Sequence, residues 1–288
     1  MKSLFKRQLL PLRWWLLVGF CVMLTVAFGA RPALYAYRLN RARRALENHR
    51  LDQAFDWLEA AGRRTPESSE VQFLLARAHR KLGRLKTARR HLESAWKLGY
   101  SKAAIEREQW MAKAQSGELS DVEPKLKAHL AQSGEDTQEI CEALVNGYLR
   151  NYDFAAARNW VDAWQSDFPT AAQPHYCRGV IWRYLRWYAK ATDEFTKALA
   201  LDPERSDIRL ELAKNLELQD SFDAALEHYR ICCEQRADDP QAMSGLANCL
   251  SRLGEHSEAQ TLYQRILDRW PEQVGARLGL AKLDLAAG

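Results

Sequence analysis

The sequence of 288 residues predicts an all-α protein, in which one membrane-spanning helix precedes a solenoid of about seven helix–turn–helix hairpins and a C-terminal capping helix. Three observations lead to this prediction. An uncharged run of seventeen residues lies near the N-terminus. Beyond it, small and large apolar residues return at a period of 34. A hydrophobic content of 47% with only 14 Gly and 9 Pro favours packed helices over disorder.

The uncharged run extends from Trp14 to Ala30, between Arg13 and Arg31. A helix of about 17–25 mostly apolar residues is long enough to cross the hydrocarbon core of a bilayer. Trp14 lies at the end of the run, where aromatic residues mark the membrane interface. We therefore expect residues 14–31 to form an uncleaved transmembrane anchor that follows a short basic tail, residues 1–13.

Two other interpretations of this segment remain open. Lys2, Lys6 and Arg7 would suit a cleaved secretory signal, although Arg31-Pro32 follows the best cleavage position too closely. A buried core helix is the third interpretation. Basic residues flank both ends of the run, so the positive-inside rule does not set the orientation. Because a short charged tail is hard to translocate, we expect a single-pass protein with its repeats on the exported side of the membrane.

A fixed period organises the rest of the chain. Small residues follow one another at a spacing of 34, and one extra residue falls within the series: Ala54, Ala88, Val122, Ala156, Ala191, Ala225 and Ala259. Four residues after each stands a large apolar side chain: Leu58, Leu92, Leu126, Trp160, Phe195, Tyr229 and Tyr263. Because offsets of four lie on one face of a helix, the series predicts one amphipathic helix in every period.

A second helix precedes each of these. Pairs such as Leu212-Ala213 and Leu246-Ala247 recur in it at one register, and Gly83 and Gly254 mark turns between the two helices. Proline then closes some of the periods, as at Pro203. Each period is therefore expected to be a helical hairpin.

These residues resemble the tetratricopeptide repeat, a helix–turn–helix unit of 34 residues. The stretch from His175 to Pro203 is the best match, with Gly179, Trp182, Ala191, Phe195, Ala198 and a final Leu201-Asp202-Pro203. The resemblance implies a solenoid over residues 35–288, with units 35–68, 69–102, 103–136, 137–170, 172–205, 206–239 and 240–273 and a cap at 274–288. Bulky Trp110 and His129 stand where small residues are usual, so packing is expected to open in the third unit.

The sequence contains no catalytic or phosphate-binding motif. Its seven histidines are scattered, so we expect no enzyme, no cofactor and no metal site. Cys232, Cys233 and Cys249 lie close to His228 in sequence or in the next helix. Such residues bind a soft metal or pair as disulfides in some proteins. Because Cys232 occupies a small-residue position of the repeat, free core cysteines are the favoured interpretation.

The resemblance further implies that the first helix of each hairpin lines a concave groove, at its second, fifth, ninth, twelfth and thirteenth places. The predicted lining residues are Arg43, Phe73, Arg77, Arg80, Lys81, Arg107, Val145, Tyr148, Tyr176, Val180, Arg183 and Tyr184, and then Lys214, Asn248, Ser251 and Arg252. This groove would suit an extended peptide with acidic residues at one end and apolar residues in the middle. The expected function is a membrane-anchored scaffold that holds a protein partner and promotes assembly of a complex. Charges that only keep the array soluble are the alternative.

Charge is unevenly distributed along the chain. Residues 1–100 carry a net charge of +13, and the remaining residues carry −8. A second functional hypothesis is therefore binding of anionic lipid or nucleic acid through the basic helix beside the anchor, which contains Arg38, Arg41, Arg43 and Arg44. Lipid is favoured over nucleic acid, because the anchor would hold these arginines against the membrane.

Overall fold

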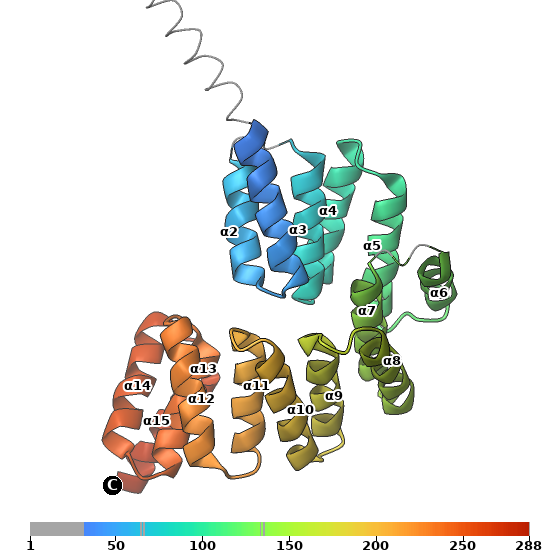
Figure 1. Ribbon diagram of the computed structural model, residues 1–288. Helices are drawn as coiled ribbons and strands as arrows, with labels where there is room; N and C mark the ends of the chain where they lie inside the picture. The colour runs from blue at the N-terminus through green and yellow to red at the C-terminus, as the bar shows by residue number, and fades with distance from the viewer. Residues whose placement is uncertain (1–31, 64, 66, 133, 135, 288) are drawn as a thin grey trace, which may run out of the picture. The chain divides into compact units, whose positions relative to one another are not determined.

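The computed structural model describes residues 32–287 except for residues 64, 66, 133 and 135. Over this part the chain is all helical, with fifteen helices and no strand (Figure 1). The expected anchor, residues 14–31, lies outside the described residues. Within the part that is described, every helix is too short or too polar to cross a bilayer.

The helices follow one another along the chain as alternate first and second helices of hairpins. The first covers residues 32–47. The others are α2 (Leu51–Gly62), α3 (Ser69–Lys81), α4 (Leu85–Lys97), α5 (Lys102–Gln115), α6 (Glu123–Gln132), α7 (Thr137–Arg150), α8 (Phe154–Asp167), α9 (Ala172–Tyr184), α10 (Tyr188–Leu201), α11 (Ser206–Glu217), α12 (Phe222–Gln235), α13 (Pro240–Arg252), α14 (His256–Arg269) and α15 (Val274–Ala287).

The chain divides into two compact units between Glu108 and Gln109, within α5. We call them the N-terminal unit and the C-terminal unit. Helix α5 is the first helix of the hairpin 103–136, for which the sequence predicts opened packing. The division therefore falls in the hairpin whose residues depart most from the repeat.

Burial follows the predicted period. In α2 the buried residues are Ala54, Leu58 and Ala61, and in α4 they are Ala88, Leu92 and Ala95. Small residues let neighbouring helices approach, and the large residue between them fills the space that remains. These two second helices therefore bury the face that the 34-residue series predicts.

The fourth hairpin corrects the predicted series. Its second helix, α8, buries Ala157, Val161 and Trp164, whereas the sequence series places Ala156 and Trp160 at these positions. The extra residue consequently lies between Val122 and Ala157, not after Ala156. Since one residue turns a helix by about 100°, the shift changes which side chains of this hairpin face the core.

The turns between the paired helices confirm this register. Each holds one residue with positive φ, and these residues are His49, Gly83, Gly117, Tyr152, Arg186, Asp220 and Gly254. Their spacing is 34 everywhere except between Gly117 and Tyr152, where it is 35. The same extra residue is thus seen in the turns and in the core. It belongs to the segment before or within α7, the first helix of the fourth hairpin.

Candidate functional site

The C-terminal unit contains a groove of about 1000 Å³. Its walls come mainly from the first helices α11 and α13 and from the capping helix α15. The residues Arg183, Lys214, Asn248, Ser251 and Arg252, which the sequence places at lining positions, all line it. Between the first helices, the rings of Tyr229 and Tyr263 reach the groove from the second helices α12 and α14.

One polar chain crosses this groove from α9 to α13. Arg183 donates to Glu211, and Lys214 Nζ lies 3.0 Å from Glu211 Oε1. Lys214 Nζ also donates to Gln241 Oε1 at 2.8 Å. Burial by itself would raise the pKa of the Glu211 carboxyl, but Arg183 and Lys214 lower it overall. Two cations of the predicted groove are therefore balanced by a carboxylate of the same chain.

A second polar chain involves Glu217 on α11. Its carboxylate accepts a hydrogen bond of 2.8 Å from the Tyr229 hydroxyl and another from the Asn248 amide. Burial raises the pKa of Tyr229, and the neighbouring Glu217 carboxylate raises it further. Tyr229 therefore stays a neutral donor, which holds the aromatic floor of the groove to α11.

The side of the groove formed by α15 differs from the α11 side, because its cation, Lys282, is not balanced by a carboxylate within the described part of the chain. Among the described residues no carboxylate lies within ion-pair distance of Lys282. Leu278 lies one helical turn before Lys282 and is half-exposed on the same wall. This end of the groove therefore offers a cation beside an apolar surface.

In the N-terminal unit, two cationic residues of the predicted groove form ion pairs inside the fold. Glu108 on α5 accepts from Arg80 Nε at 2.5 Å and from Arg77 Nε at 3.1 Å. Arg80 and Glu108 are each only 1% exposed, and Phe73 is buried as well. The prediction that Phe73 and Arg80 line a groove is thus corrected, since both side chains lie in the core.

The other predicted residues of this unit are more accessible. Arg43 donates to Glu70 of α3 at the surface. Lys81 Nζ lies 3.5 Å from His49 Nε2, and Arg107 is partly exposed. These lining residues remain a prediction, and they belong to a different unit from those at Tyr148 and beyond.

The predicted aromatic middle of the groove is only partly accessible. Val145 is fully buried, because the one-residue shift of the fourth hairpin turns it into the core, and its assignment to the groove is corrected. Tyr148 donates to Glu123 Oε2 at 2.7 Å. Tyr176 and Val180 are partly buried in the packing of α9. Tyr184 alone of these five residues is exposed.

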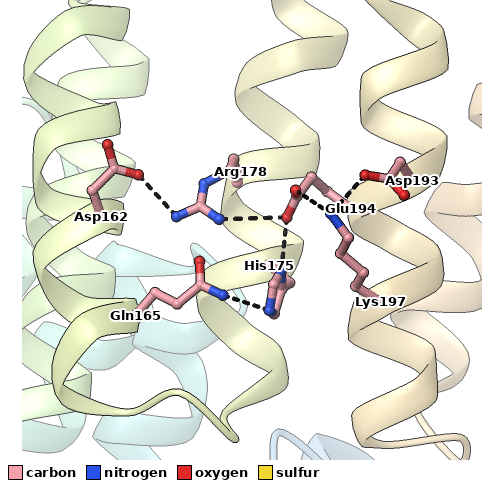
Figure 2. A network of polar contacts seen from close by, with 7 residues as sticks. All are labelled: Asp162, Gln165, His175, Arg178, Asp193, Glu194 and Lys197. Carbon is pink, nitrogen blue, oxygen red and sulfur yellow. Dashed lines mark hydrogen bonds and ion pairs between the residues drawn. The ribbon is translucent and has the colours of Figure 1, made fainter.

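A further polar network, which the sequence does not reveal, joins α8, α9 and α10 (Figure 2). His175 Nδ1 lies 2.7 Å from Glu194 Oε2, and Gln165 Nε2 lies 2.6 Å from His175 Nε2. Arg178 binds Asp162 Oδ1 at 2.8 Å and also faces Glu194. In this arrangement His175 contacts Glu194 through one ring nitrogen and the Gln165 amide through the other.

This network has the carboxylate–histidine arrangement of many active sites, but an amide stands where a nucleophile would be needed. Each of its charged groups contacts a group of opposite charge or a hydrogen-bond partner in Figure 2. It therefore acts as a polar link between three successive helices. The hydrogen-bonded pairs that join its helices are 10–19 residues apart along the chain, too far for a local motif.

In the basic helix 32–47, two of the four arginines bind other groups of the same chain. Arg38 Nη1 donates to the Ala60 carbonyl at 2.7 Å, and Arg43 binds Glu70. Arg41 lies over the ring of Trp57 with its charge still at the surface, and Arg44 is exposed. A lipid-binding patch on this helix would depend mainly on Arg41 and Arg44.

The cysteines Cys141, Cys232, Cys233 and Cys249 are free thiols. Burial raises the pKa of the Cys232 and Cys249 thiols to about 12 and that of Cys233 to about 11. Such thiols stay protonated and unreactive at neutral pH. Over the described residues, no group of three or more metal-ligating side chains is placed to hold an ion.

Three segments of the chain match family models of the tetratricopeptide repeat, at residues 45–109, 172–205 and 241–272. The fold is similar to a chain of the "APC/C hetero-tetramer Cut9-Hcn1", with 13% identity and a TM-score of 0.60 over 84% of this chain and 48% of that one. The present chain therefore spans about half of that relative.

Two further solved structures are similar over most of their own length. One is PilF of Pseudomonas aeruginosa, with 13% identity, a TM-score of 0.48 and coverage of 88% of this chain and 99% of that one. The other is YrrB, "a TPR protein with an unusual peptide-binding site", with 14% identity, a TM-score of 0.43 and coverage of 76% and 95%. No curated protein matches the sequence.

Proposed function

We propose that this chain, which contains tetratricopeptide repeats, holds an extended segment of a partner protein in the groove between α11, α13 and α15. Proteins built from this repeat are generally interaction modules rather than enzymes. The observation that carries the proposal is the groove itself. In it, Lys214, Asn248 and Ser251 from successive first helices face a common space.

The chemistry of the groove supports a polypeptide segment as its occupant. Its volume of about 1000 Å³ is at the upper end of ordinary ligand sites. Hydrogen-bonding groups such as Gln241, Asn248 and Ser251 follow one another along it, as the repeated amides of an extended backbone require. At the α15 end, Lys282 and Leu278 would accept an acidic residue next to an apolar one.

Photoreactive residues at Asn248 and Leu278, placed one at a time in the full chain, test this proposal in intact cells. A matched position is Arg230, which is exposed on α12 and outside the groove. We expect one protein to be crosslinked from both groove positions and not from Arg230. Equal crosslinking from all three positions would rule out the groove as the binding site.

We further propose that residues 14–31 hold the repeats at a membrane, where the bound partner is brought into a complex. This step is supported by the uncharged sequence alone. Extraction of isolated membranes with alkaline carbonate should leave the full chain in the pellet. Release into the supernatant would exclude an integral anchor. Protease treatment of intact and opened membranes then reports which side carries the repeats.

Binding of anionic lipid by helix 32–47 is the second candidate function. Its support is the exposure of Arg41 and Arg44 beside the expected anchor. The internal bonds of Arg38 and Arg43 weaken it, because these two cations are already engaged. The peptide groove is therefore the preferred function.

A further inference from the structure

Exposed aromatic and basic side chains gather at two successive turns of the C-terminal unit. We call this set the turn-edge patch, and it consists of Arg150, Tyr152, Tyr184, Arg186, Trp187 and Lys190. Tyr152 is 73% exposed, Tyr184 54% and Trp187 51%. So much exposed aromatic surface in one place is unusual, because such side chains are ordinarily buried.

Ring contacts show that the two turns lie side by side. The ring of Phe154 is 6.3 Å from that of Tyr152 and 5.8 Å from that of Tyr184. In the second turn, Trp182 stacks on Trp187 with centroids 5.1 Å apart. Tyr152, Phe154 and Tyr184 thus form one cluster of rings that spans both turns, and Trp182 and Trp187 form a stacked pair at the second turn.

The cations of the patch are not balanced by carboxylates. Among the described residues, Arg150, Arg186 and Lys190 lie within ion-pair distance of no acidic side chain. Lys190 Nζ instead lies 4.2 Å from the centre of the Trp187 ring, and Arg186 Nε contacts the Tyr188 hydroxyl at 3.3 Å. Elsewhere in this unit, cations such as Arg183 and Arg205 are paired. The patch is therefore a locally positive aromatic surface.

The backbone gives an independent reason to assign the patch a role. Tyr152 and Arg186 have φ values of 60° and 62°, in the left-handed region that favours glycine. The equivalent turns hold glycine at Gly83, Gly117 and Gly254, and at His49 and Asp220 they hold residue types that enter this region more readily than Tyr or Arg. Large side chains are thus kept at two adjacent turns in spite of a conformational cost, and such outliers cluster at functional surfaces.

We propose that the turn-edge patch docks onto the anionic headgroups of a lipid bilayer. Tryptophan and tyrosine rings favour the membrane interface, and arginine and lysine bind acidic headgroups. Side chains that project from the tips of turns suit a broad surface, whereas a peptide needs a groove such as the one lined by α11, α13 and α15. Residues 14–31, if they anchor the chain, would hold it at a bilayer. The patch is separate from the groove, so docking does not depend on peptide binding.

The test uses the full chain reconstituted into phosphatidylcholine vesicles, with or without about 30% phosphatidylglycerol. A small fraction of the lipid carries a photoreactive headgroup, and lipid adducts are located on the protein by mass spectrometry. We expect adducts on the peptides that contain Tyr152 and Trp187 in the anionic vesicles. In pure phosphatidylcholine, and at high salt, their yield should fall.

The decisive variant combines Tyr152→Gly with Arg186→Gly. Glycine is favoured at both positions, so thermal stability should be unchanged or higher, while the adduct yield at the patch falls by roughly fivefold or more. His49→Gly is the matched control, because His49 has the same backbone conformation in the other unit. Adduct yields at the patch should be unaffected by it.

Equal adduct yields in the double variant and the parent chain would overturn the proposal. So would adducts confined to other parts of the chain.

Discussion

At the scale of single residues, the fold of the C-terminal unit depends on close contacts between helices. Gly245 on α13 lies against the ring of Tyr229, and a Cβ atom added there would come within 2.2 Å of the ring. Tyr229 in turn donates to Glu217 and forms part of the groove floor. The absence of a side chain at Gly245 thus determines where an aromatic ring of the candidate site lies.

We predict that Gly245→Ala destabilises the protein by about 1–3 kcal/mol, because the ring must move to make room. Gly275→Ala is the matched control, since a Cβ atom there meets nothing within 4 Å. It should be neutral or stabilise α15 by up to about 1 kcal/mol. Urea unfolding of the two variants measures both effects. A neutral Gly245→Ala would show that the ring is not held in place.

At the scale of helices, one extra residue decides which side chains of α7 and α8 are buried. The buried residues of α8 are Ala157, Val161 and Trp164, and Val145 on α7 is buried with them. A shift of one residue turns a helix face by about 100°. Val145 was therefore assigned to the groove from the wrong face of α7.

The register can be tested with two neighbouring alanines. Ala157→Leu should cost about 1–3 kcal/mol of stability, because Ala157 is fully buried and its space is already filled. Ala156→Leu, at a partly exposed position, should cost clearly less. Thermal unfolding of the two variants measures the difference. The reverse order would support the series that places Ala156 in the core.

A second prediction at this scale concerns α3 and α4, where the rings of His79 and His91 stack 5.2 Å apart. Burial lowers the pKa of both imidazoles below 6.5, and His91, Arg84 and Arg90 lower that of His79 further. The folded protein therefore binds fewer protons than the unfolded chain near that pH. The stability that the folded state keeps while both imidazoles are neutral is complete above pH 6.5, and it is lost as the pH falls below that value.

We expect the free energy of unfolding of the N-terminal unit to decrease between about pH 7 and pH 5. Urea titrations at a series of pH values measure it. His91→Gln should flatten the pH dependence, because one of the two groups is then absent. His256→Gln, at an exposed position on α14, should leave the profile as it is. If the free energy of unfolding of the parent chain does not change with pH, the lowered pKa values of His79 and His91 are contradicted.

At the scale of the whole molecule, stability in a solenoid comes mainly from contacts between neighbouring hairpins. The N-terminal unit contains a buried ion group in which Glu108 binds both Arg77 and Arg80. The C-terminal unit has its own links, such as the network around Glu194 (Figure 2). Glu108 is the last residue of the N-terminal unit, so a substitution there should destabilise that unit and leave the C-terminal unit unchanged.

We predict that Glu108→Ala destabilises the N-terminal unit by about 3–5 kcal/mol, because it leaves Arg80 buried without a counter-charge. Glu106→Ala, which removes an exposed pair with Lys102, should change stability by less than about 1 kcal/mol. Hydrogen exchange should rise in α3 and α5 of the first variant and stay unchanged in α13. Faster exchange throughout the chain would show that the two units unfold together.

The sequence alone predicted the stack of hairpins. Residues such as Ala54 and Ala88 recur at a fixed period, and periodicity is a local property that the chain carries with it. Lys214, Asn248 and Ser251, which the same period assigns to lining positions, line the cavity of the C-terminal unit. Only the tertiary structure decided the register of α8, because Ala155, Ala156 and Ala157 are consecutive alanines and fit the series equally well.

The pairing of charges was likewise decided by the tertiary structure. In the sequence, Arg77, Arg80 and Arg183 are basic residues at lining positions, and they predict a cationic groove. Their carboxylate partners, Glu108 and Glu211, lie 28–31 residues further along the chain. Whether a cation is free for a partner depends on which side chain the next hairpin brings within about 3 Å, and the sequence period carries no information on that distance.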